Sequence, residues 1–110
     1  MTADQFRKEA LRVPGAIEGA HVGHPDFRIG GKIFASLGAP DEAWGMVKLT
    51  PEEQQSYLHA APKAFRACNG AWGRRGYTNV YLASASVSVV RPALAAAANN
   101  VLLPSKAKHG

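Results

Sequence analysis

The strongest pattern of hydrophobic and polar positions lies in residues 24–37 and predicts a β-hairpin. Two apolar, β-prone arms, 27–29 and 32–37, flank Gly30-Gly31, a pair that can adopt the positive φ angles of a two-residue turn. Such a turn sets the pairing of the arms, with opposed residues on the same face: Ile29 with Lys32, Arg28 with Ile33, and Phe27 with Phe34. Apolar residues then occur on both faces of the hairpin.

Helix-start signals and helical spacing predict a long helix near each end of the chain. A candidate capping box spans residues 2–5, and an apolar face follows until a Pro-Gly pair at 14–15 ends the pattern. Residues 87–103 are rich in alanine and have apolar residues at helical spacing. Pro92 fits this second helix only within the first turn, where its missing amide hydrogen costs little, so we place the start near Ser88.

The segment between these helices contains one short helix and the remaining strands. A threonine N-cap, a following proline and a glutamate at the third helical position predict a helix from Thr50 to about His59. Residues 69–76 form a glycine-punctuated turn. Strands beyond the hairpin are expected within 16–23, at 44–49 and at 77–83. Two long helices cannot cover both faces of a five-stranded sheet, so we expect one solvated, partly apolar face that carries Arg28, Lys48 and Tyr81.

The distribution of charge changes this picture more than the total does. The 110 residues have a formal net charge of +5, yet all eight carboxylate side chains lie at or before Glu53, and the seven Lys and Arg residues of 54–110 have no acidic counterpart. A basic surface of this kind attracts polyanions, so nucleic acid or an acidic protein surface is a plausible partner. The alternative is that the charge serves solubility alone.

Several classes of protein are disfavoured by simple absences. The chain has no apolar run long enough to span a bilayer and no signal-peptide pattern, so we expect a cytoplasmic protein with no membrane partner. Cys68 is the only cysteine, which excludes an intrachain disulfide and a multi-cysteine zinc site. Glycine-rich phosphate-binding loops and a nucleophile elbow are missing as well, so nothing supports an enzyme.

Arg74 and Arg75 are the strongest candidates for a binding site. They stand beside Trp72 and Tyr77 in the glycine-rich segment, where a wing-like turn could place guanidinium groups on phosphates and an aromatic ring against a sugar or base. The alternative is a surface turn anchored by a buried Trp72, with two solvated arginines.

Further basic residues extend this candidate surface. Arg28 and Lys32 flank the hairpin turn and Lys48 lies on a neighbouring strand, so the three could share a patch if all point outward. Alternatively, Arg28 pairs with Asp26 or Glu18 and loses its free charge. Two more cations of the acid-free half are secondary candidates: Lys63 and Arg66.

Metal binding and cysteine chemistry receive less support from the sequence. His21, His24 and Asp26 have a spacing that could contact one metal ion, but no fourth ligand is evident and a structural turn is the simpler interpretation. Cys68 could act as a nucleophile with His59 as its base, but no acid in the second half could orient the histidine, which favours a buried thiol. We therefore expect no metal and no cofactor.

The order of several short blocks resembles the MmcQ/YjbR family, small bacterial proteins with a fold like that of the CyaY/frataxin group. The clearest block is His24-Pro25-Asp26-Phe27-Arg28 followed by 31–35, and weaker ones are 6–15, 47–55 and the Trp-Gly-rich segment 70–78. The chain departs from the family pattern at Arg74-Arg75, where an aromatic residue more often recurs, and at the proline of the last helix.

The resemblance implies an α+β fold, a two-layer sandwich in which an antiparallel sheet of about five strands packs against N- and C-terminal helices. The resemblance covers nearly the whole chain, and the length of 110 residues fits a single domain, 1–110, in which 104–110 is expected to be a flexible basic tail. It also implies a double-wing arrangement and DNA binding, by analogy of fold. We expect a monomeric, non-enzymatic module that contacts the phosphates of duplex DNA. The alternatives are a domain that docks on an acidic protein and, less favoured, a frataxin-like metal or small-ligand binder.

Overall fold

A computed structural model describes residues 1–103, and the expected tail at 104–110 lies outside this part. Eleven elements follow one another along the chain: α1 (Ala3–Leu11), β1 (Ile17–His21), β2 (His24–Ile29), β3 (Lys32–Leu37), β4 (Trp44–Lys48), α2 (Pro51–Ala60), β5 (Phe65–Ala67), α3 (Gly70–Arg74), β6 (Tyr77–Tyr81), the 3-10 helix η1 (Leu82–Ser84) and α4 (Val87–Leu102). No helix within 1–103 is long and apolar enough to cross a membrane.

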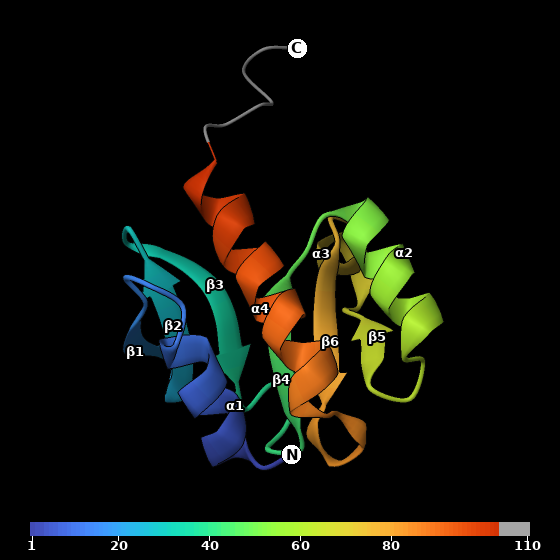
Figure 1. Cartoon of the computed structure of the whole chain (residues 1–110), viewed down its shortest axis with the longest axis horizontal. Coiled ribbons are helices and arrows are strands. Elements are labelled where there is room, and N and C mark those ends of the chain that lie inside the picture. The colour runs from blue at the N-terminus through green and yellow to red at the C-terminus, as the bar shows by residue number, and fades with distance from the viewer. Residues whose placement is uncertain (104–110) are drawn as a thin grey trace.

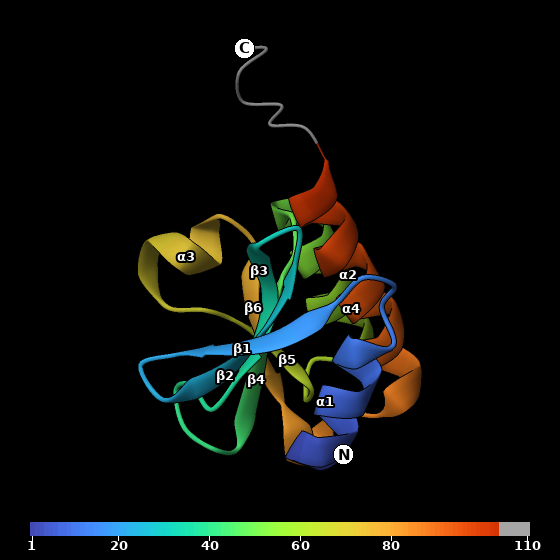
Figure 2. The same ribbon diagram turned by 90° about the vertical axis from the view of Figure 1, so that its left-hand side faces the viewer.

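The strands form one antiparallel sheet in the order β1-β2-β3-β4-β6-β5. Helices α1, α2 and α4 cover one face of this sheet, as Figure 1 shows, while α3 lies on the other side (Figure 2). The predicted α+β sandwich with N- and C-terminal helices is therefore confirmed. The sheet has six strands rather than about five, because the short segment Phe65–Ala67 pairs with β6 as an edge strand.

The core lies between the sheet and helix α4. Alanines on this helix, Ala93 and Ala97 among them, are fully buried, and their small side chains let the helix approach the central strands closely. Phe27 and Phe34 fill the space from the sheet side, and Phe6 of α1 packs at 6.1 Å from Phe27, measured between ring centroids. Burial of these aromatic rings supplies much of the hydrophobic stabilisation.

The two hairpin arms pair as predicted next to the turn and differently beyond it. Ile29 lies opposite Lys32 and Arg28 opposite Ile33, but Phe27 lies opposite Ala35 and not Phe34. A β-bulge between Phe27 and Arg28 causes this shift, because two residues of β3 face one position of β2. Both Phe34 and Ala35 are fully buried as a result.

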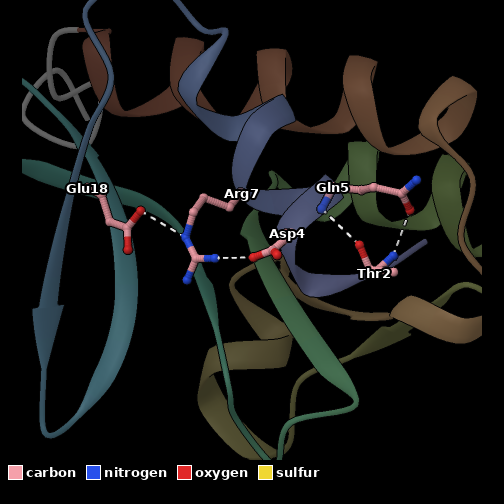
Figure 3. Close-up of polar contacts among 5 residues, drawn as sticks. All are labelled: Thr2, Asp4, Gln5, Arg7 and Glu18. Atoms are coloured by element: carbon pink, nitrogen blue, oxygen red, sulfur yellow. Dashed lines mark hydrogen bonds and ion pairs between the residues drawn. The ribbon is translucent and has the colours of Figure 1, made fainter.

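Helix α1 begins with the predicted capping box, which Figure 3 shows in detail. The Thr2 hydroxyl accepts from the Gln5 amide at 3.1 Å, and the Gln5 side chain accepts from the Thr2 amide at 2.8 Å. Arg7 then joins the helix to β1, since its guanidinium donates to Asp4 at 2.6 Å and to Glu18 at 3.0 Å. The same type of box, made by Thr50 and Glu53, begins α2.

The C-terminal helix begins one residue earlier than predicted. Ser86 is its N-cap and Val87 its first residue, so Pro92 lies in the second turn and not in the first. A proline there removes one hydrogen bond and disturbs the carbonyl four residues earlier, at Ser88. Pro92 and Ser88 are both exposed, so water can solvate the freed carbonyl group. The buried alanine face of α4 is not interrupted.

Within residues 69–76, where the sequence predicted a turn, Gly70–Arg74 form a short helix, α3. Its position depends on very close backbone contacts: a Cβ atom on Gly73 would lie 1.8 Å from the Cys68 carbonyl oxygen, and one on Gly76 would lie 2.3 Å from that of Leu49. The buried Gln54 of α2 donates to the carbonyls of Gly73 and Tyr77, at 3.1 and 3.0 Å. Tertiary contacts of this kind override the low helix propensity of glycine.

Replacing Gln54 by leucine should therefore destabilise the protein. Leucine removes one of the donors of two carbonyl groups, which keep only their backbone donors Gly76 and Cys68 at 3.0 Å. The free energy of unfolding should therefore fall by about 0.5–1.5 kcal/mol per hydrogen bond lost. Urea unfolding followed by circular dichroism measures the change. Gln55→Leu, at the exposed neighbouring position, is the matched control and should alter the free energy of unfolding by less than about 0.5 kcal/mol. Equal effects of the two substitutions would contradict the assigned role.

Candidate functional site

The face of the sheet opposite α1, α2 and α4, here called the open face, carries most of the candidate residues. The strand pairings place Asp26, Ser36, Met46, Asn79 and Arg66 in one row across it. Strand alternation adds further positions to the same face: Arg28, Trp44, Lys48, Tyr77 and Tyr81. The prediction that Arg28, Lys48 and Tyr81 share the uncovered face is therefore confirmed by the register.

A groove of about 530 Å³ crosses this face. Ile33, Ser36, Met46 and Asn79 form its floor. One side is bounded by α3, and the other by the β1–β2 turn together with the β3–β4 loop, which project from the same side of the sheet in Figure 2. Within residues 1–103, no aspartate or glutamate lines the groove. Its surface combines an apolar floor with polar groups and a cation, Lys48.

Two aromatic rings and two cations form a cluster where α3 meets the sheet. Trp72 stacks on Tyr77 with 5.2 Å between ring centroids and 16° between planes. The Arg75 guanidinium lies 5.1 Å from the centroid of Trp72, and the Lys48 ammonium 5.1 Å from that of Tyr77. Such contacts hold a cation in place while leaving it charged and hydrated on its outer side. We call these four residues the α3 cluster.

The opposite end of the open face repeats this combination at the sheet edge. The rings of Trp44 and Tyr81 lie 4.9 Å apart, and the guanidinium of Arg66 lies 4.7 Å from the Trp44 centroid. Lys63 lines a hollow of about 290 Å³ together with these three residues. The predicted secondary candidates Lys63 and Arg66 therefore lie together, and this second group is called the β5 cluster.

Arg28 does not offer a free charge. Its guanidinium donates twice to the carboxylate of Asp26, at 2.7 and 3.0 Å, and His21 contacts the same carboxylate at 3.0 Å. The Asp26 side chain is fully buried, and the hydrogen bond from Arg28 holds the pKa of this carboxyl below its ordinary value despite the burial. The pairing with Asp26, which the sequence left open as an alternative, is the arrangement observed.

Lys32 does not join a patch with Arg28 and Lys48. It lies opposite Ile29, a residue buried beneath the helices, so Lys32 belongs to the helix-covered side of the hairpin end. The condition for a shared patch, that all three side chains point outward from one face, is therefore not met. The two-residue turn sets this arrangement: it pairs Arg28 with Ile33 and Ile29 with Lys32. Neighbouring residues of a strand point to opposite faces, so Lys32 and Arg28 lie on opposite faces of the hairpin.

Arg74 and Arg75 are not on a wing-like turn. Arg74 is the last residue of α3 and Arg75 is its C-cap, and both are exposed. Trp72 is 55% exposed, so it is not the buried anchor that one interpretation required. The proximity of Arg75, Trp72 and Tyr77 that the sequence suggested is observed.

Ion pairs divide the basic residues of 1–103 into two groups. Four arginines pair with carboxylates: Arg7, Arg12, Arg28 and Arg91. The other cations make no ion pair with the residues of this part of the chain. Apart from Lys8 and Lys32, they belong to the two clusters or to the end of α3: Lys48, Lys63, Arg66, Arg74 and Arg75. The acidic first half therefore neutralises mainly α1, α4 and the β1–β2 hairpin.

Cys68 lines the groove as a protonated thiol. Burial raises its pKa to about 11, and its sulfur donates to the Asn79 side-chain oxygen at 3.3 Å. His59, its candidate partner, lies near the end of α2 and is exposed. Within the described residues, no three His, Cys, Asp or Glu side chains are grouped to hold a metal ion, and Asp26 of the candidate triad is bound by Arg28.

The sequence analysis missed Trp44, Met46 and Asn79 as members of this surface. Their alternation along β4 and β6 was a usable signal, because residues two apart along one strand lie on the same face of the sheet. The contribution of α3 as one wall of the groove had no such signal, since it depends on the contacts of Gly73 and Gly76.

Comparison with known proteins agrees with the fold. The model of the YjbR family matches residues 11–97, and the chain belongs to this family. The crystal structure of Deinococcus radiodurans protein DR2400, described with the family-model domain DUF419, is similar with a TM-score of 0.73 at 16% sequence identity, over 96% of this chain and 80% of that one. No curated protein matches the sequence.

Replacing Asp26 by asparagine should reduce stability in a manner that depends on pH. The lowered pKa means that the charged carboxylate stabilises the fold above about pH 4, the ordinary value in the unfolded chain, and that this contribution is lost as the pH falls through the lower folded value. At pH 7 the substitution should lower the free energy of unfolding by roughly 1–3 kcal/mol.

Urea unfolding of both proteins from pH 7 to pH 2 measures this dependence. The difference between them should shrink below about pH 4. Asp4→Asn also removes a carboxylate paired with an arginine, but Asp4 is 80% exposed, so that control should have little effect at any pH. A difference between Asp26→Asn and the unsubstituted protein that stays constant down to pH 2 would show that the charge of Asp26 contributes nothing.

Proposed function

We propose that this protein is a non-enzymatic module that binds DNA through the open face, mainly by contacts to phosphates. One observation carries the proposal: the cations of the α3 and β5 clusters make no ion pairs within residues 1–103, whereas most of the cations elsewhere do. Unpaired cations are available to replace the counterions of a polyanion, which is the main source of sequence-independent affinity for DNA.

The arrangement of the aromatic residues supports the same proposal. Arg75, Arg66 and Lys48 each lie against a ring, which limits the conformational freedom that these long side chains would lose on binding a phosphate. The two clusters occupy opposite ends of β4 and β6, and three residues of strand lie between Lys48 and Trp44. A backbone that follows the open face could therefore contact both ends.

A binding role also agrees with the state of the potential reactive groups. A Cys68 thiol with a pKa of about 11 is protonated near neutral pH and is a poor nucleophile. The carboxylate of Asp26 is bound by Arg28 and His21. We propose no catalytic residue and no cofactor, and we place the protein with its DNA partner in the cytoplasm as a monomer.

A salt titration of duplex binding tests the proposal. The logarithm of the association constant should fall linearly with the logarithm of the salt concentration, with a slope of about 0.9 per phosphate contacted. Arg74→Ala/Arg75→Ala should weaken binding and reduce this slope by about two. Fluorescence anisotropy of a labelled duplex at several salt concentrations gives both quantities.

The matched control is Lys8→Ala/Arg12→Ala, which removes the same net charge from α1, on the other side of the sheet. It should change the slope much less. Equal effects of the two double variants would show that only net charge matters and would overturn the assignment to the open face. Failure of the unsubstituted protein to bind duplex DNA even at low salt would favour an acidic protein partner.

A further inference from the structure

We propose that the groove on the open face receives an unpaired base, so that the protein binds single-stranded DNA more tightly than duplex DNA. This inference rests on the proposed function, because the same cations would hold the strand. It goes further in naming the form of DNA and a contact beyond the phosphates.

The size and position of the groove are the first argument. Its volume of about 530 Å³ lies within the range of sites that enclose small organic molecules. Both faces of a base are covered by its neighbours in a duplex, so only an unstacked base can lie flat on a protein surface. The floor is the pleated surface of β3, β4 and β6, and α3 and the β3–β4 loop rise on either side.

The chemistry of the floor suits a nucleobase. Ile33 and Met46 provide apolar surface, and a methionine sulfur makes favourable contacts with aromatic rings. Asn79 can form hydrogen bonds to the edge of a base. Its side-chain oxygen accepts from the Cys68 thiol at 3.3 Å, which orients the amide. The amide nitrogen donates to no atom within residues 1–103 and can donate to a carbonyl or ring nitrogen on a base edge.

Charge complementarity identifies the occupant as an anion. Lys48 lines the groove at the α3 end and Arg75 lies beyond Trp72. Asp26 belongs to the same face, but both of its oxygens accept from Arg28 or contact His21. A base on the floor would thus have its flanking phosphates near unpaired cations. A neutral peptide would lack this match and a cationic one would be repelled, while an acidic peptide would meet the same cations but offers no planar base for the floor.

Three labelled ligands of equal length separate base contacts from phosphate contacts. They are a single strand of about 12 nucleotides, the same strand without bases, and the corresponding duplex. Fluorescence anisotropy at one salt concentration gives their affinities. One stacked base should make the single strand bind about tenfold more tightly than the abasic strand. The duplex should also bind more weakly than the single strand.

Asn79→Leu tests the floor directly. The substitution keeps the number and branching of the side-chain heavy atoms and should reduce severalfold the ratio of the affinities for the base-containing and abasic strands. Asn99→Leu, at an exposed position of α4, is the matched control and should leave all three affinities unchanged.

Cys68 supplies a second measurement that needs no substitution. It is the only cysteine of the chain and it lines the groove, so its rate of alkylation by iodoacetamide reports occupancy. A saturating single strand should slow the reaction severalfold at alkaline pH, where some thiolate forms, and the saturating abasic strand should not.

The outcomes distinguish this inference from the proposed function. Equal affinities for the base-containing and abasic strands, or a Cys68 that no strand protects, would overturn base binding while leaving phosphate binding intact. Protection by a free mononucleotide but not by the strand would also overturn it. No binding of any of the three ligands would contradict the proposed function itself.

Discussion

The close approach of backbone to backbone at Gly73 and Gly76 determines what the open face can do. Without room for the Cβ atoms of other residues, α3 can pack there only because both positions are glycine, and Gln54 then holds the segment from the opposite layer. The placement of α3 converts a flat sheet surface into a groove with a wall. It also presents Trp72 to Tyr77 and Arg75 to Trp72.

The ion pairs and the packed core lie mostly on the helix-covered side of the sheet, and the cations unpaired within residues 1–103 lie mostly on the open face. The carboxylates of the first half neutralise arginines on α1, α4 and β2, which are the elements that bury the core or close the sheet edge. On the open face, Arg28 is paired with Asp26, but Lys48, Arg66 and Arg75 lie against aromatic rings, which attract them without neutralising them. The uneven charge along the chain thus becomes an uneven charge in space, with Lys8 and Lys32 as exceptions.

Local signals predicted the fold well because they act over a few residues. The capping boxes at Thr2 and Thr50 and the glycine turn of the hairpin all occur where the sequence placed them. The candidate site was less predictable. The pairing of Arg28 with Asp26, two residues away on the same strand, was left open because spacing alone does not show that the Asp26 carboxylate is buried. The helical form of 70–74 depends on Gln54, which lies far along the chain.

The bulge in β3 determines which residues of that strand face the core and which face the groove. By adding one residue to one arm, it lets Ile33 and Ser36, three positions apart, both face the groove, while Phe34 and Ala35 both enter the core. Deleting Phe34 would restore regular alternation, so Ile33 and Ser36 would still face the groove and Ala35 the core, but the core would lose one fully buried aromatic ring. A single backbone irregularity therefore lets β3 bury two consecutive side chains in the core while it keeps Ile33 and Ser36 on the groove.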